Sequence, residues 1–292
     1  MTAETTDMPA VADGAPGAAP ARPAPTVQAD GSPVLTVADY IDEAYVFLGA
    51  GAAVLLQMAM PGVGHGVADH SDTLSDPLGR LRTTMSYIYA VSIGTDAERK
   101  AIVEMVNKAH IPVRGEGYNA FDPKLQLWVA ATLYHGGIDL HERLHGPMDP
   151  ASAEAIYRES QAYGTALQVR DEMWPEDLAG FREYWDSTVA ELAVDGKVLA
   201  YARNLLKGGS APWYIRIGMP LNRLVTTGLL PEQVRRAYRL KWSRPRQLLF
   251  DTLFRVIRVV YPWIPRAVRT LPARYYLNDL RKRIRDGRPI AR

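Results

Sequence analysis

Residues 106–133 read VNKAHIPVRGEGYNAFDPKLQLWVAATL and contain the end of one helix, a turn and the start of the next. Apolar residues recur at helical spacing up to His110, and Pro112 cannot continue the helix because proline lacks the amide hydrogen. Asp122 followed by Pro123 is typical of a helix start, since the carboxylate caps free amide groups of the first turn. The stretch therefore predicts two helices joined by a short turn, with His110 at the end of the first.

The same signals recur along the chain, where polar caps, prolines and glycines separate segments of helical spacing. Strand-like alternation is scarce, so we predict an all-α fold in the form of a multi-helix globular domain. The predicted helices cover residues 36–60, 76–93, 95–110, 122–133, 150–164, 175–192, 196–206, 231–242, 245–260 and 272–285.

The chain of 292 residues is 47% hydrophobic and contains no cysteine. This hydrophobic content is enough for a large core, in one big domain or two small ones. The absence of cysteine excludes disulfides, zinc–thiolate sites, cysteine-held iron–sulfur clusters and thiolate-ligated haem. Any metal or haem must therefore rely on histidine, carboxylate or other oxygen and nitrogen ligands.

Composition divides the chain into three predicted parts. Residues 1–33 are rich in Ala, Pro and Gly and lack the basic start and apolar core of a secretory signal, so we predict a disordered arm. Residues 34–240 form the predicted helical domain that carries the functional site. Residues 241–292 form a predicted basic tail: from residue 233 onward, 17 Lys and Arg against three Asp give a net charge of +14, which leaves −12 for the remainder of a chain whose total is +2.

The tail interleaves apolar residues with arginines. The apolar residues are Leu248, Leu249, Leu253, Phe254, Val256, Ile257, Val260, Tyr261 and Trp263, and the arginines are Arg255, Arg258, Arg266 and Arg269. This pattern is typical of a helix that binds an anionic membrane surface. The alternative is a tail that packs on the body, with its arginines paired to the acidic domain. No recognition motif accompanies the charge, so nucleic acid is not an expected partner.

The best apolar window begins at Tyr45, and we predict that it is a buried core helix because it is rich in Ala and Gly and follows two acidic residues. We therefore expect a cytoplasmic protein with a peripheral position at the membrane.

Three ordered blocks between Leu55 and Leu133 resemble the oxygenase MpaB/rubber oxygenase catalytic domain family. The blocks are LLQMAMPGVGHGVADHS, DPLGRLRTTMSYIYAVSIG and VNKAHIPVRGEGYNAFDPKLQLWVAATL. The resemblance weakens after Leu133 and is slight after about Gly164. It implies an all-α fold that encloses non-covalent haem b, with the histidine of the H-x-x-V-x-G block as iron ligand. Here that residue is His110.

In the family, the arginine and threonine of an R-x-x-x-T pattern line the distal haem pocket, and they correspond to Arg80 and Thr84, one helical turn apart. The implied roles are a fixed cation near bound dioxygen or a haem propionate, and a hydroxyl donor beside it. Latex-clearing relatives place a lysine just before that threonine, whereas this chain has Thr83. Neither a lysine ligand to the iron nor cleavage of polyisoprene is therefore expected.

The resemblance implies a haem-dependent oxidoreductase that uses dioxygen or peroxide on a small hydrophobic substrate of alkene, isoprenoid or lipid-like character. The predicted cofactor-binding residues are His110, Arg80, Thr84 and Arg114, and the predicted catalytic residues are Arg80, Thr84, Asp69 and His70. From the residues alone, an ordinary histidine at a helix end is the favoured interpretation of His110, and a polar turn or helix-capping pair explains Asp69 and His70 nearly as well.

Two rival functions remain open from the residues. The segment His141-Glu142-Arg143-Leu144-His145 satisfies the H-E-x-x-H pattern of a zinc hydrolase, in which two histidines bind the metal and the glutamate is the base. Gly136-Gly137 before it and Gly146-Pro147 after it predict a frayed, exposed segment. The third possibility is a helical binding protein without catalysis. We expect architectural roles for Tyr118, Asp122 and Trp128.

Overall fold

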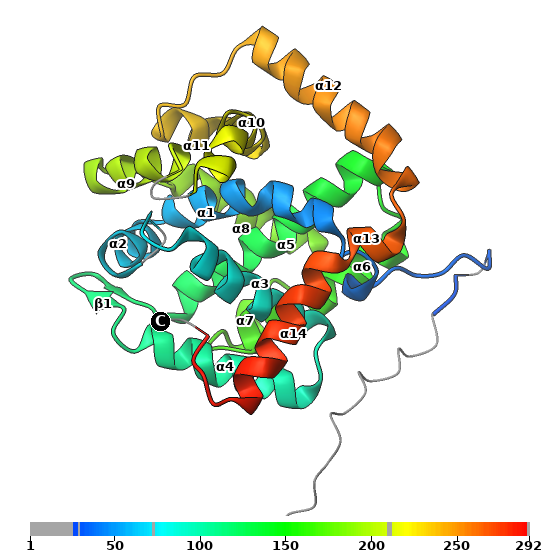
Figure 1. The fold of residues 1–292 in the computed structure, drawn as a ribbon, viewed down its shortest axis with the longest axis horizontal. Coiled ribbons are helices and arrows are strands. Elements are labelled where there is room, and N and C mark those ends of the chain that lie inside the picture. The colour runs from blue at the N-terminus through cyan, green and yellow to red at the C-terminus, as the bar shows by residue number, and fades with distance from the viewer. Residues whose placement is uncertain (1–25, 29, 72–73, 209–211, 291–292) are drawn as a thin grey trace, which may run out of the picture.

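The computed structural model describes residues 26–28, 30–71, 74–208 and 212–290 (Figure 1). Within this part of the chain, the one sheet consists of two short antiparallel strands, β1 (Arg114–Gly115) and β2 (Tyr118–Asn119). Nearly all other regular structure is helical, so the predicted all-α fold is confirmed. The predicted disordered arm lies for the most part outside the described residues; of the part that is described, Gln28 donates a hydrogen bond to Asp149 (2.9 Å).

The helices, with short 3₁₀ helices labelled η, are η1 (Val37–Asp39), η2 (Ala44–Gly49), α1 (Ala50–Met58), α2 (Pro61–His70), α3 (Pro77–Ile93), α4 (Asp96–His110), α5 (Pro123–His145), α6 (Pro150–Ser160), α7 (Ala162–Thr165), η4 (Asp171–Met173), α8 (Leu178–Glu191), α9 (Gly196–Leu206), α10 (Trp213–Leu229), α11 (Glu232–Ala237), α12 (Arg244–Val260), η5 (Tyr261–Trp263), α13 (Arg266–Arg269) and α14 (Leu271–Arg285).

Helix starts follow the predicted caps. The Asp76 carboxylate accepts a hydrogen bond from the amide of Gly79 (2.9 Å) at the start of α3. Thr95 and Glu98 form a reciprocal capping box at the start of α4. The Asp122 carboxylate accepts from the amide of Lys124 (2.8 Å) at the start of α5. These boundaries are confirmed because each depends on contacts within one helical turn.

Other segments differ from the prediction. The single helix predicted for 36–60 is instead η1, η2 and α1, and α2 follows at Pro61. A proline at the first position of a helix costs no hydrogen bond, so Pro61 begins a new helix at the place where the predicted one ends. Helix α10, which contains Pro220, was not predicted. The predicted helices at 150–164 and 231–242 are shorter or divided in the structure.

Helix α5 lies at the centre of the molecule, packed against α1, α7, α12 and η2 (Figure 1). Trp128 on this helix is fully buried, and its indole N–H donates to the carbonyl of Leu56 (3.0 Å). Its ring also packs against Trp185 of α8, with a centroid distance of 5.2 Å. The architectural role predicted for Trp128 agrees with this burial, which joins α5 to α1 and α8.

Within the described residues, no single helix is long and apolar enough to cross a membrane. One bent pair, Ala44–Met58 followed by Pro61–His70 at an angle of 108°, meets the length and composition criteria together.

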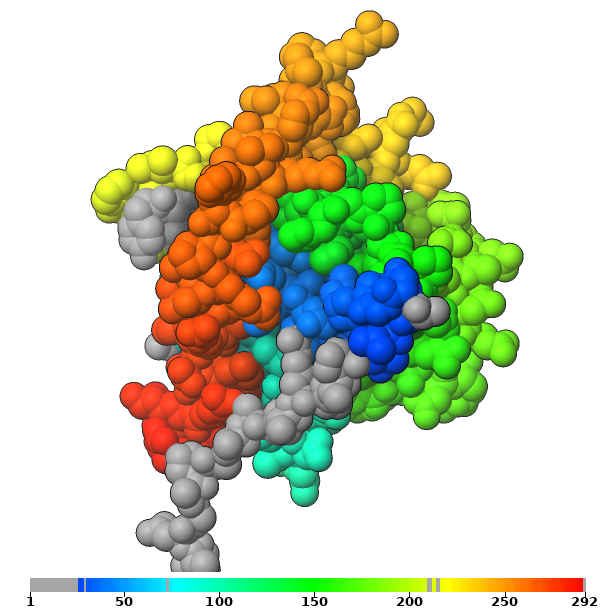
Figure 2. Space-filling model, turned by 90° about the vertical axis from the view of Figure 1, so that its right-hand side faces the viewer, coloured from blue at the N-terminus to red at the C-terminus, as the bar shows by residue number. Residues whose placement is uncertain are grey.

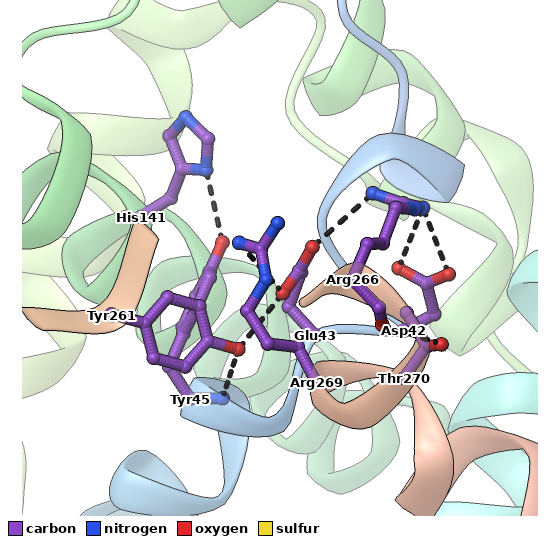
Figure 3. Close-up of polar contacts among 8 residues, drawn as sticks. All are labelled: Asp42, Glu43, Tyr45, His141, Tyr261, Arg266, Arg269 and Thr270. Atoms are coloured by element: carbon purple, nitrogen blue, oxygen red, sulfur yellow. Dashed lines mark hydrogen bonds and ion pairs between the residues drawn. The ribbon is translucent and has the colours of Figure 1, made fainter. Parts of the chain in front are cut away.

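The basic tail contacts the body through a buried polar cluster (Figure 3). Glu43, which precedes η2, is buried and accepts a hydrogen bond from the hydroxyl of Tyr261 (2.8 Å). Two arginines of α13 pair with the same carboxylate, Arg266 at 3.2 Å and Arg269 at 3.3 Å. Arg266 also pairs with Asp42 (3.0 Å). This cluster joins residues more than 200 positions apart in the sequence.

Helix α14 continues the contact along α3 and α4. Arg281 donates to the buried Glu98 (2.5 Å), and Arg82 of α3 lies 3.9 Å from Asp279. Arg266 and Arg269 of α13 and Arg281 of α14 thus meet acidic residues of the body, as the packed-tail alternative predicts. The division of the chain at residues 240 and 241 stays a prediction.

We predict that Gly228→Ala destabilises the contact between α10 and α12. A methyl group at this position would overlap the ring of Phe250, a buried residue of α12. Overpacking of this kind costs roughly 1 to 3 kcal/mol. The matched control is Gly136→Ala in α5, where no atom lies within 4 Å of the added carbon. Urea unfolding should show a lower midpoint for Gly228→Ala alone; equal midpoints would contradict the packing described.

Candidate functional site

His110 is the last residue of α4, on the same side as the buried Ile102 and Val106. Its ring packs edge-on against Phe121, with a centroid distance of 6.3 Å. The Nδ1 atom is buried and has no hydrogen-bond partner among the described residues. Burial, and secondly the charge of Arg80, lower the pKa of His110 to about 4. The imidazole is therefore neutral at neutral pH, and a neutral imidazole is the form that binds metals.

Arg80 lies on α3, which packs directly against α4. The residue is exposed by surface area, yet burial lowers the pKa of its guanidinium. Arg80 is therefore accessible to solvent, while the protein around it lowers the pKa of its guanidinium. Among the described residues, no carboxylate pairs with it. An unpaired cation in such a place can bind an anion or a polar ligand.

Tyr201 of α9 belongs to the same neighbourhood. Burial lowers the pKa of Arg80, and the charge of the nearby Tyr201 phenol acts in the opposite direction. The hydroxyl is buried and has no hydrogen-bond partner among the described residues. Sequence reasoning missed Tyr201, because no local motif marks it and it lies 121 positions after Arg80. The structure thus brings an imidazole, a guanidinium and a phenol into one neighbourhood from three helices.

Thr84 lies one turn after Arg80, and its hydroxyl donates to the carbonyl of Arg80 (3.2 Å). Because the Thr84 hydroxyl donates its proton to this carbonyl, only the lone pairs of its oxygen remain for a ligand. Thr84 could therefore accept a hydrogen bond from a ligand, whereas the family resemblance implied that it donates one. The preceding Thr83 is buried and donates to the carbonyl of Gly79 (3.1 Å), with the carbonyl of Ile290 at 3.4 Å. Thr83 thus contacts the C-terminal segment.

Asp69 and His70, at the end of α2, belong to a separate polar cluster. The hydroxyl of Tyr118 donates to Asp69 (2.9 Å) and lies 3.2 Å from Nε2 of His70. Asp69 also forms an ion pair with Lys197 of α9. Both residues are exposed, and the structure shows no contact between them and His110 or Arg80. Their predicted catalytic role stays a prediction.

Arg114 begins the β1–β2 hairpin that follows His110, and it is exposed. Gly117 in the hairpin turn has a φ of +77°, a conformation that favours glycine. A side chain at Gly115 would meet the ring of Tyr118 at 2.7 Å. Both glycines are therefore explained by the hairpin itself, and a contact of Arg114 with a cofactor stays a prediction.

The H-E-x-x-H segment lies on the unbroken last turns of α5, with Leu140 and Leu144 buried, so the predicted frayed segment is wrong. The prediction failed because Gly137 packs closely on the Tyr40 ring, which lets the helix continue through the glycine pair. Nδ1 of His141 lies 3.0 Å from the hydroxyl of Tyr45, beside the buried polar cluster around Glu43 (Figure 3). Among the described residues, no group of three or more His, Cys, Asp or Glu side chains is arranged to hold a metal ion.

Residues 38–259 match the family described as "ER-bound oxygenase mpaB/B'/Rubber oxygenase, catalytic domain". Two mycobacterial proteins are each 40% identical to this chain over 249 residues, which cover 82% of this chain and 98% of the relative. They are the uncharacterized protein Mb2261 of Mycobacterium bovis and the uncharacterized protein Rv2237 of Mycobacterium tuberculosis. No solved structure matches the chain.

Proposed function

Because this chain belongs to the ER-bound oxygenase mpaB/B'/rubber oxygenase catalytic domain family, we propose that it is a haem b-dependent oxygenase that acts on a small hydrophobic substrate. The observation that carries this proposal is the state of His110. A neutral imidazole lies at the end of α4 near Arg80, and neither its buried Nδ1 atom nor the Arg80 guanidinium has a partner among the described residues. The proposal extends the oxygenase character of the family to a particular cofactor and ligand.

The residues present fit a haem held by one protein ligand. A single imidazole can hold a haem iron, whereas a zinc site requires three or four protein ligands. An unpartnered buried nitrogen costs free energy, and a ligand or hydrogen-bond acceptor that reaches the ring would remove that cost. His110 would therefore hold the iron, and Arg80 would pair with a propionate or with a polar group on the other face.

Haem b, when bound, supplies the iron that activates dioxygen or peroxide. The protein's own residues supply orientation and charge. Arg80 would offer a positive charge to a bound ligand, and the Tyr201 hydroxyl, which has no partner among the described residues, would offer a hydrogen-bond donor. Thr84 offers an acceptor from one turn away. We expect the substrate to be an alkene, isoprenoid or lipid-like molecule, because the family description includes a rubber oxygenase and rubber is an unsaturated isoprenoid polymer.

The experiment that tests this function uses the protein loaded with haem. The reduced protein should bind carbon monoxide with a shift of its Soret band. Oxygen uptake or peroxide consumption should rise with a panel of alkenes, isoprenoids and unsaturated fatty acids. A haem-loaded protein that binds no carbon monoxide and turns over neither oxidant would refute the catalytic proposal.

We predict that Arg80→Gln slows this turnover by about a hundredfold, since removal of one preorganised donor from an active site typically costs that much. The matched control is Arg99→Gln, an exposed residue of α4 that forms an i,i+3 pair with Asp96. Turnover should be measured per bound haem, so that weaker haem binding is not counted as slower catalysis. Equal turnover of the two variants would show that Arg80 does not belong to the active site.

A further inference from the structure

Helix α12 presents an apolar face to the outside of the molecule. Figure 1 shows this helix at the outer edge of the fold, and Figure 2 shows it along the surface. Five exposed aliphatic residues lie on one side at helical spacing, which we call the α12 face: Leu248, Leu249, Val256, Val259 and Val260. Leu248 is 65% and Val259 63% exposed. The opposite side carries Phe250 and Phe254, which are buried.

An apolar side chain of unusual exposure continues this face. Trp263, in η5 directly after α12, is 84% exposed, the highest fraction among the large apolar side chains of the described residues. Helix α10, which packs beside α12, exposes Ile217 (70%) and Leu221 in a second apolar stripe. Within the described part of the chain no segment covers these residues, and an exposed apolar patch of this kind is typical of a binding surface.

The exposed arginines of α12 differ from those of α13 and α14. Arg255 and Arg258 have no ion pair within the described part of the chain, and neither does Arg244 at the start of the helix. Arg266 and Arg281, by contrast, pair with carboxylates of the body. Pairing with the body therefore accounts for Arg266 and Arg269 of α13 and for Arg281 of α14, and it leaves the arginines of α12 unexplained.

We propose that the α12 face, together with Trp263, binds the surface of an anionic lipid bilayer. Aliphatic residues flanked by arginines are the combination that an interfacial helix requires, since the apolar side enters the headgroup boundary while the cations meet lipid phosphates. Tryptophan is enriched at the same depth because its ring is amphipathic. This inference rests on exposure and charge, and it is independent of the proposed haem chemistry.

The test is co-sedimentation of the full chain with vesicles of phosphatidylcholine containing phosphatidylglycerol. The protein should pellet with these vesicles at low salt and less with pure phosphatidylcholine. Raised salt should weaken the binding, because it screens the arginine contribution. Removal of each arginine near the surface should weaken partitioning about fivefold, so Arg255→Gln with Arg258→Gln should lower it roughly thirtyfold.

A second variant tests the apolar side. Leu249→Glu, Val256→Glu and Val260→Glu together should abolish vesicle binding and leave the fold intact, because all three side chains are already exposed. Val27→Glu, at an exposed apolar residue outside the α12 face, is the control and should bind as the wild type does. Folded wild-type protein that stays in the supernatant at low salt would overturn the proposal. A stable dimer that the triple variant disrupts, without vesicle binding, would also overturn it in favour of a second copy of the chain.

Discussion

Purified His110→Ala protein is expected to lose the Soret band and the bound haem of the wild type, while His135→Ala retains both. His110 is the one histidine that combines a buried, unpartnered ring nitrogen with a position near an unpaired arginine. His135 is also largely enclosed, but its ring stacks on Trp185 with a centroid distance of 3.8 Å. Absorbance spectra and haem content per chain measure the difference.

Chemical rescue with imidazole shows whether His110 binds the iron or only stabilises the fold. His110→Gly leaves space where the ring was, so added imidazole should restore part of the Soret band in that variant. Circular dichroism should show that both variants remain folded. If His110→Ala binds one haem per chain with the spectrum of the wild type, the assignment of His110 is wrong even if the protein is a haem protein.

Replacement of Glu43 by alanine is expected to destabilise the protein by about 3 kcal/mol, since it leaves the largely buried Arg269 without its carboxylate partner. The carboxylate is 5% exposed and is shared by Tyr261, Arg266 and Arg269 (Figure 3). For a domain of this size the midpoint of thermal unfolding should fall by roughly 10 °C. Glu43→Ala should also loosen α13 from the body, which faster proteolysis of the tail would reveal.

The matched control is Glu154→Ala, which removes an exposed ion pair with Arg158 (2.7 Å) on α6. Exposed pairs contribute between about 0 and 1 kcal/mol, so this variant should unfold close to the wild type. Equal midpoints for the two glutamate variants would mean that the cluster does not hold the tail to the body.

Features that depend on one helical turn were predictable from the sequence. The starts of α3, α4 and α5 follow from Asp76, Thr95 and Asp122, because each cap contacts an amide two or three positions later. The glycine pair before the H-E-x-x-H segment misled the same reasoning. Gly137 lies against the ring of Tyr40, which is almost one hundred positions earlier in the sequence, so this glycine serves close packing and does not end the helix.

Features that depend on distant contacts were not predictable. Tyr201 carries no local signal, and only the fold brings its phenol near Arg80. The charge asymmetry of the tail was visible in the sequence, but its division into paired and unpaired arginines was not. Arg266 pairs with Glu43 and Asp42, which lie more than 200 positions earlier in the sequence, whereas Arg255 on α12 is exposed.

If the folded chain holds one haem b through His110, the wild-type protein should retain this cofactor after it is supplied with haemin and freed of the excess. The pyridine haemochrome spectrum and elemental analysis should give one protohaem and one iron per chain. Folded protein that retains no haem, or that contains one zinc per chain instead of iron, would contradict the claim.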